Sequence, residues 1–352
     1  MRYSEHFAER IRRAAESPYF KEYVKSRDSI LSLIDDAPAH TASEYWSQEV
    51  AGFEYLFDAS PLIVEKFRHH SYHITGVYEY QYRKHHARKS GPYREKLEAL
   101  SAIDSKSLFV PESPELGGFG FNIGGKLVNL DTLKFYEFLI GLDRAGFIEP
   151  IQRDAHPVVV EIGSGWGGFA YQFKKLFPKC SYVLVDLPES LLFSATYLRA
   201  LFPNANIFLP HSLEEYANVD FSEYDFVFVP STAWERLKPQ KIDLAMNMVS
   251  FQEMTDAQIR SYVSRLADFR CPRIYSLNRD RSPNNEEISG VTALMMERYT
   301  TKAVQVLPIP YHVLKAPEPT LFGSLKKFVK KMLGRKSVQS PHEYRHVSGV
   351  LT

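Results

Sequence analysis

The most informative part of the sequence is the stretch Pro157-Val-Val-Val-Glu161-Ile-Gly163-Ser-Gly165-Trp-Gly167-Gly168. Three β-branched residues lead into an acid and a glycine cluster, and residues 169–177 then show helical spacing. This order predicts a buried parallel strand, a tight turn and the start of a helix. Glycines let a ligand lie against the backbone, and the helix start supplies N–H donors and a positive dipole end. The stretch therefore predicts a ligand site suited to a carboxylate or a phosphate.

The glycine spacing fits two cofactor patterns. Gly163, Gly165 and Gly168 fit the dinucleotide pattern G-x-G-x-x-G. Gly163, Gly165 and Gly167 equally fit E-x-G-x-G-x-G, the pattern of S-adenosylmethionine (SAM) methyltransferases. A second predicted strand, 181–186, ends in an acid placed to bind ribose hydroxyls. Both cofactors contain a ribose, so this acid supports a nucleoside ligand without choosing one, and a glycine-rich turn without cofactor is the third interpretation.

A third apolar segment, residues 241–254, ends in Asn247-Met-Val-Ser250-Phe-Gln-Glu-Met254. Together with Glu161-Ile-Gly-Ser-Gly-Trp-Gly and Val185-Asp186-Leu-Pro-Glu189, in this order and spacing, it resembles the bacterial sugar O-methyltransferase family. That family belongs to the class I SAM-dependent methyltransferases. The resemblance implies a Rossmann-like fold, SAM as cofactor and methyl transfer to a hydroxyl oxygen. The implied acceptor is a small molecule or a glycan, chiefly a sugar in a bacterial glycan or glycosylated metabolite.

The alternation of strand and helix patterns predicts an α/β fold with a doubly wound, mainly parallel sheet and an N-terminal helical cap. Strands are expected over residues 157–162, 181–186, 225–229, 242–248, 273–277 and 303–308. Residues 206–209 read as an added strand. The predicted organisation is a helical cap or lid region (1–110), a glycine-rich loop with a helix (111–150), a SAM-binding domain (151–315) and a basic amphipathic tail (316–352).

The cofactor would lie at the ends of the strands. The residues expected to bind it are Glu161, Gly163, Ser164, Gly165, Gly167, Asp186, Leu187, Ser231 and Asn247. If 225–229 is the third strand, Trp234 lies near the adenine ring; if 206–209 is the third strand, His211 and Ser212 take that place. Asp131, which begins a predicted helix, either faces this pocket or caps the helix.

A sugar hydroxyl is a poor nucleophile while protonated, so a base should assist the transfer. Glu253 is the ionisable residue at the tip of the fourth strand and is the first candidate base, although it also suits a helix cap. His211 is the second candidate. The residues expected to bind the acceptor are Ser250, Gln252, Tyr80 and His312. Tyr80 belongs to a segment dense in His and Tyr. Clustered carboxylates are not evident, so no metal is expected.

Composition limits the remaining classes. The net charge of the 352-residue chain is +1, which argues against a general nucleic-acid binder. Cys180 and Cys271 lack metal-ligand spacing and are expected to be reduced thiols of a cytoplasmic protein. The basic amphipathic stretch 321–336 predicts peripheral contact with the inner face of an anionic membrane. The alternative is a helix docked on the domain, or a loose tail. The rival functions are an NAD(P)-dependent oxidoreductase and a non-catalytic scaffold, and the oligomeric state is not set by the sequence.

Overall fold

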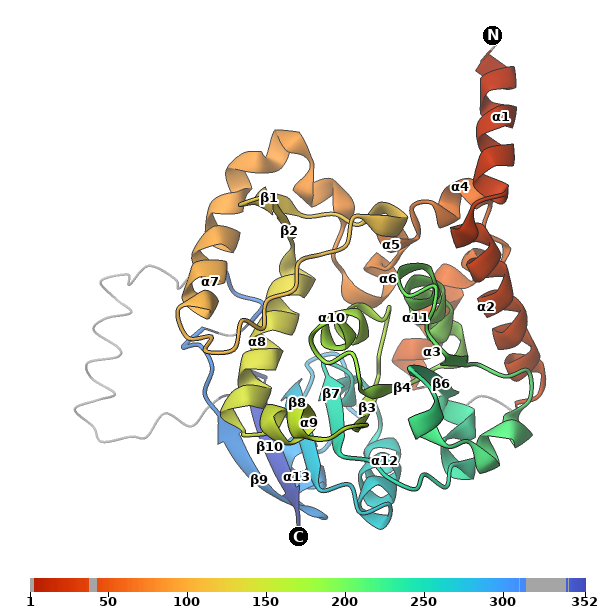
Figure 1. Cartoon of the computed structure of the whole chain (residues 1–352). Helices are drawn as coiled ribbons and strands as arrows, with labels where there is room; N and C mark the ends of the chain where they lie inside the picture. The colour runs from red at the N-terminus through yellow and green to blue at the C-terminus, as the bar shows by residue number, and fades with distance from the viewer. Residues whose placement is uncertain (1–2, 38–42, 310, 315–339, 341) are drawn as a thin grey trace.

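A computed structural model describes residues 3–37, 43–309, 311–314, 340 and 342–352 of the chain (Figure 1). Its centre is an eight-stranded sheet in the order β5-β6-β4-β3-β7-β8-β10-β9. The first six strands in this order are parallel, and β10 is antiparallel to both of its neighbours. The strands of this sheet are β3 (Val158–Ile162), β4 (Ser181–Asp186), β5 (Ile207–Phe208), β6 (Phe226–Pro230), β7 (Leu244–Met248), β8 (Arg273–Arg279), β9 (Tyr299–Val304) and β10 (Tyr344–Leu351). A small separate hairpin pairs β1 (Phe121–Ile123) with β2 (Lys126–Val128).

Helices surround this sheet. Those before β3 are α1 (Tyr3–Ala15), α2 (Pro18–Asp35), α3 (Glu44–Phe53), α4 (Pro61–Val64), α5 (Phe67–His70), α6 (Tyr72–Thr75), α7 (Gly91–Ser101), α8 (Leu130–Arg144) and α9 (Ile148–Arg153). Those after β3 are α10 (Gly168–Leu176), α11 (Pro188–Leu201), α12 (Asp256–Asp268) and α13 (Val291–Met295). Short 3-10 turns include η2 (Glu79–Tyr82), η7 (Ser231–Arg236) and η8 (Phe251–Glu253).

The order of the strands places a ligand site above β3. The chain runs from β3 through α10 to β4 and through α11 to β6, and then returns to the other side of β3 as β7. The connections therefore diverge between β3 and β7, and ligands of such sheets bind at the carboxyl ends of the strands at this point. Helix α8 packs beside α10, since Phe138 contacts both Phe169 of α10 and Tyr275 of β8. The sequence prediction of a doubly wound, mainly parallel α/β fold is confirmed.

The structure also decides the uncertain strands. Phe226–Pro230 pairs with β4 as the third strand, and Ile207–Phe208 is added at the edge, as predicted. The predicted last strand, 303–308, overlaps β9 only at its end. β10 was not predicted and falls in the range assigned to a tail, so for these residues that assignment is wrong. Strand β10 carries polar residues, and these are buried only because the strand is inserted between β8 and β9. One of them is His346, whose ring nitrogen lies 3.0 Å from the Tyr275 hydroxyl.

The N-terminal region is partly extended and partly packed on the core. Helix α1 projects from the body of the molecule, whereas α2 packs along α11 (Figure 1). Residues 61–75 form three short helices, and Gly76 ends the last of them with a φ of 66°. Cys180 and Cys271 are both buried and free. None of the described helices is long and apolar enough to cross a bilayer, and the basic stretch 321–336 lies outside the described residues.

Candidate active site

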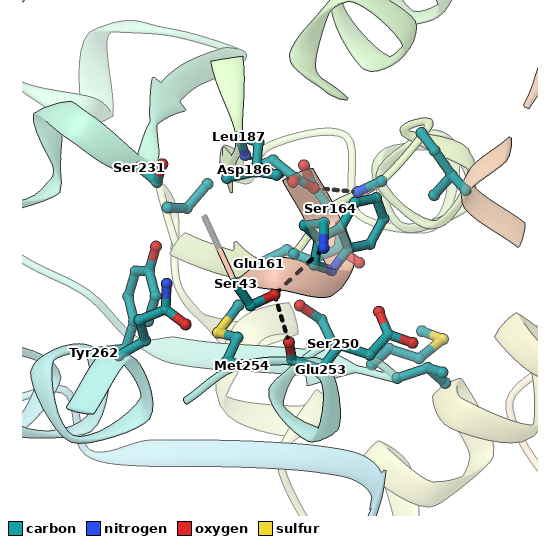
Figure 2. Close-up of a pocket in the computed structure, with 18 of the residues that line it drawn as sticks. Ser43, Glu161, Ser164, Asp186, Leu187, Ser231, Ser250, Glu253, Met254 and Tyr262 are labelled. Carbon is teal, nitrogen blue, oxygen red and sulfur yellow. Dashed lines mark hydrogen bonds between the residues drawn. The ribbon is translucent and has the colours of Figure 1, made fainter. Parts of the chain in front are cut away.

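A cavity of about 450 Å³ opens at the carboxyl ends of β3, β4, β6 and β7. Figure 2 shows Asp186, Leu187 and Ser231 along one side of it, and Ser250 and Glu253 along the other. Other side chains that line the cavity include Ser43, Trp46, Ile74, Lys134, Glu161, Ser164, Trp166, Thr232, Trp234, Met254, Tyr262 and Tyr311. Its wall therefore combines the strand tips with residues of the N-terminal region, of α8 and of the segment after β9.

The glycines of the turn allow another segment of the chain to approach the backbone closely. Gly163 and Gly165 have φ angles of 73° and 54°, in the left-handed region that favours glycine. A Cβ atom at Gly163 would lie 2.0 Å from the Ser250 hydroxyl, so no side chain fits there. The two tips of β3 and β7 can meet only because this position is glycine.

Two backbone donors of this turn are already used within the protein. Gly163 N–H donates to the Val185 carbonyl at 2.7 Å, and Gly165 N–H donates to Asp186 Oδ2 at 2.6 Å. The start of α10 is also covered, because the Trp166 ring occupies the place where a side chain at Gly168 would be, 2.1 Å from the ideal Cβ. A phosphate group would find this helix start covered by an indole rather than open as in a dinucleotide site.

Asp186 is fixed by the backbone on both of its oxygens. Its Oδ1 accepts a hydrogen bond from Leu187 N–H at 2.8 Å, and Oδ2 accepts the bond from Gly165. Burial raises the pKa of Asp186 to about 6, so the carboxylate is mainly ionised at neutral pH. An ionised, rigid carboxylate at the end of the second strand is the arrangement that binds ribose hydroxyls.

Next to this carboxylate, after β6, the cavity contains unsatisfied polar groups. The Thr232 hydroxyl and the Trp234 indole N–H are buried and have no hydrogen-bond partner in the structure. Buried polar groups normally have partners, so two such groups on one cavity wall fit a ligand with ring nitrogens. The predicted position of Ser231 and Trp234 at this wall agrees with the geometry.

Two carboxyl groups, the buried Glu161 and the half-buried Glu253, lie on the β3 and β7 sides. Glu161 accepts a hydrogen bond from the Tyr182 hydroxyl at 2.8 Å, and burial raises its pKa to about 8. Glu253 lies in η8, and burial raises its pKa to about 8 as well. The alternative role of Glu253 as a helix cap is taken by Thr255, which caps α12 together with Gln258. Glu253 therefore lines the cavity without capping α12, and Gln252 and Trp46 are hydrogen-bond partners of its carboxyl group.

Other predicted residues support the strand tips without lining the cavity. Asn247 donates to the Ile162 carbonyl at 2.7 Å and accepts from Phe251 N–H at 3.0 Å. Gln252 accepts from Arg279 N–H at 2.9 Å. Gly167, with a φ of 82°, begins α10. These contacts hold β3, β7, β8 and the following turns in register.

Three predicted residues lie away from this cavity. His211 is exposed beside α2, with ring nitrogens 3.4 Å from the hydroxyls of Ser29 and Ser32. Tyr80 lies in η2 and is 51% exposed. His312 packs against Tyr344, although the neighbouring residue, Tyr311, does line the cavity. The structure thus brings Glu253 but not His211 to the glycine turn.

A buried ion cluster links the N-terminal region to this turn. The Arg68 guanidinium lies 2.8 Å from Glu112 and 2.8 Å from Asp131, and stacks 3.7 Å from the centre of the Trp166 ring. Asp131 therefore neither caps α8, whose cap is Asn129, nor serves the cavity directly. Its second oxygen lies 3.3 Å from Lys134, which does line the cavity.

The charge of the cavity wall is uneven. Its acidic residues are Glu161, Asp186, Glu235 and Glu253, and Lys134 is the one basic residue among the described residues that line it. No pattern in the sequence points to Lys134, because a lysine one turn into a helix is usually a solvated side chain. Among the described residues, no three His, Cys, Asp or Glu side chains are grouped to hold a metal ion.

Comparisons with known proteins give structural likeness only. No protein-family model and no curated protein matches the chain. Among solved structures, it is similar to WbdD, described as a bifunctional kinase-methyltransferase (13% identity, TM-score 0.37, 63% of this chain and 39% of that one). It is also similar to a phosphoethanolamine N-methyltransferase of Haemonchus contortus in complex with SAM (10% identity, TM-score 0.36, 62% and 56%). The chain thus spans about two fifths of the length of WbdD and rather more than half of the length of the N-methyltransferase.

Proposed function

We propose that the chain is a SAM-dependent methyltransferase whose cofactor occupies the cavity at the glycine turn. The observation that carries the proposal is the pairing of a backbone-held, ionised Asp186 with a glycine turn closed to phosphate by its own hydrogen bonds and by Trp166. This combination suits a nucleoside that has a ribose and no diphosphate. Similar solved proteins that are described as methyltransferases, one of them holding SAM, agree with this proposal.

The charge of the cavity also favours this cofactor. When bound, SAM supplies a methyl group activated by a positively charged sulfonium. At neutral pH the raised pKa values leave Glu161 and Glu253 mainly protonated, so the charged groups of the wall are Asp186, Glu235 and Lys134. Two carboxylates against one lysine favour a sulfonium and an ammonium group over the two negative charges of a dinucleotide diphosphate. The volume of about 450 Å³ lies within the range of ligand pockets. An NAD(P)-dependent oxidoreductase is therefore the less favoured function.

We further propose oxygen as the accepting atom and Glu253 as the base. A general base works best when its pKa lies near the operating pH, and the pKa of Glu253 is raised to about 8. We assign the orientation of the acceptor to Ser250, which lines the cavity at the same strand tip (Figure 2). A sugar as the acceptor rests on the motifs around Glu161, Asp186 and Glu253. Roles for Tyr80 and His312 in a glycan path, and membrane contact by residues 321–336, stay predictions.

The cofactor is tested by calorimetric titration of the purified full chain with SAM, S-adenosylhomocysteine and NADH. Micromolar binding of the two adenosyl ligands without binding of NADH is the expected result. Binding of NADH in place of the adenosyl ligands would reverse the assignment to an oxidoreductase. If none of the three ligands binds, the non-catalytic scaffold becomes the better description.

The acceptor is tested with SAM that carries a ¹³C-labelled methyl group. The enzyme is incubated with a panel of free sugars, nucleotide sugars and bacterial glycan extracts, and products are hydrolysed and analysed by mass spectrometry. We expect the unaltered enzyme to produce an O-methyl sugar that carries the label, and the Glu253→Gln variant not to produce it. Label recovered only as an N-methyl or C-methyl group would contradict the oxygen and sugar parts of the proposal.

A further inference from the structure

Lys134 occupies a distinctive place in the cavity. It lies in the second turn of α8, and its side chain is 15% exposed. Its ammonium group lies 5.0 Å from the centre of the Phe135 ring and 6.0 Å from that of Tyr311, which also line the cavity. A lysine held over two aromatic rings and largely removed from water is well placed to bind an anion.

The position of Lys134 is set by the buried ion cluster. One oxygen of Asp131 lies 2.8 Å from Arg68, and the other lies 3.3 Å from the Lys134 ammonium. Arg68, Glu112, Asp131 and Lys134 together carry two positive and two negative charges. Lys134 has three N–H donors, and one carboxylate partner leaves donors for a second anion.

Lys134 and Asp186 lie toward opposite ends of the cavity. Asp186 ends β4, on one side of β3. Lys134 acts on the other side, since its positive charge partly offsets the raised pKa of Glu161 in β3 and of Glu253 after β7. A ligand whose ribose is bound by Asp186 and which crosses the glycine turn therefore directs its far end toward Lys134.

We infer that Lys134 is the anchor for the carboxylate of the cofactor's methionine moiety, held in place by Asp131. The inference rests on the proposed function and extends it to the end of the cofactor that no motif in the sequence addresses. Among the described residues of the wall, Lys134 is the basic side chain available for that carboxylate. Its role makes the N-terminal region part of cofactor recognition, because Arg68 fixes Asp131.

The test compares SAM with decarboxylated SAM, which lacks only the carboxylate. Titrations use the full chain, Lys134→Met, Lys134→Arg and the surface control Lys179→Met. The unaltered chain should bind SAM about 10- to 100-fold more tightly than decarboxylated SAM, the effect of one charged hydrogen-bonded pair. Lys134→Met should abolish this preference, Lys134→Arg should keep part of it, and Lys179→Met should keep all of it.

The ratio of the two affinities separates anchoring from damage to the fold. If Lys134→Met weakens both ligands equally, Lys134 supports the structure and the inference is wrong. If the preference for SAM persists in Lys134→Met, the carboxylate binds elsewhere and the inference is also wrong. Failure of the unaltered chain to bind either ligand would instead overturn the proposed function, and this inference with it.

Discussion

The two ends of the cavity are built in different ways. At the β4 end, Asp186 is held by N–H groups of Gly165 and Leu187, which are close neighbours in the strand-and-turn motif. At the α8 end, Lys134 depends on Asp131 and Arg68, and Arg68 in turn stacks on Trp166. Backbone hydrogen bonds hold the side chain at the first end, whereas charged side chains from distant segments hold the one at the second end. Breaking the second end should therefore cost stability first, and breaking the first should cost affinity.

The largest effect is expected for Arg68→Met. The side chain of Arg68 is fully buried, and its loss leaves Glu112 and Asp131 as buried charges without their guanidinium partner. The free energy of unfolding should fall by about 3–5 kcal/mol, as measured by urea denaturation. The matched control is Arg83→Met, whose ion pair with Glu79 is on the surface and should change stability by less than about 1 kcal/mol. Equal effects of the two substitutions would show that the cluster does not tie the N-terminal region to the turn.

Asp186→Asn should act on binding more than on stability. The amide keeps the shape of the side chain, but it loses the charge that two backbone N–H groups and the proposed ribose share. Affinity for S-adenosylhomocysteine should fall by about 10- to 100-fold, measured by calorimetry. Asp268→Asn, in an exposed ion pair with Arg298, is the control and should leave affinity unchanged. An unchanged affinity of Asp186→Asn would remove the reason for placing the ribose at this end.

Glu253→Gln should change how stability depends on pH. The pKa of Glu253 is about 8 in the folded chain against an ordinary value of 4.5, so between these pH values the folded chain holds a proton that the unfolded chain has lost. The contribution of this group to stability is thus fully present below pH 4.5 and is lost as the pH rises through 8. Glu253→Gln has no carboxyl group at this position, so its stability does not fall in this way as the pH rises.

Relative to the unaltered chain, Glu253→Gln should therefore gain stability from pH 5 to pH 8, on the order of 1–2 kcal/mol for a partly solvated carboxyl. Urea denaturation at the two pH values measures the difference, and Glu161 contributes equally to both proteins. A difference that is constant with pH would show that Glu253 titrates normally and would weaken its proposed role as a base.

The smallest effect is expected for His211→Ala. The residue is exposed, and its ring nitrogens lie 3.4 Å from two serine hydroxyls of α2. Stability should change by no more than about 0.5 kcal/mol, and affinity for S-adenosylhomocysteine should stay the same by calorimetry. A clear loss of affinity would mean that α2 and the loop after β5 close over the cavity when the ligand binds.

The sequence alone determined the parts of this protein in which function follows from neighbouring residues. The glycine turn, the acid at the end of β4, the third strand Phe226–Pro230 and the parallel order of the sheet could all be predicted. In these parts, backbone angles, β-branched runs and short spacings fix the structure locally. Glu253 was also found in this way, because it directly follows a strand tip.

Only the tertiary structure decided the rest. Strand β10 and the cluster around Arg68 join segments far apart in the chain, and neither has a local pattern, because burial and charge pairing arise only when the segments meet. Lys134 looks like a surface lysine of a helix until Asp131 and the aromatic rings enclose it. The sequence therefore located the glycine turn, whereas long-range packing determined which charges surround it and raised the pKa of Glu253 to about 8.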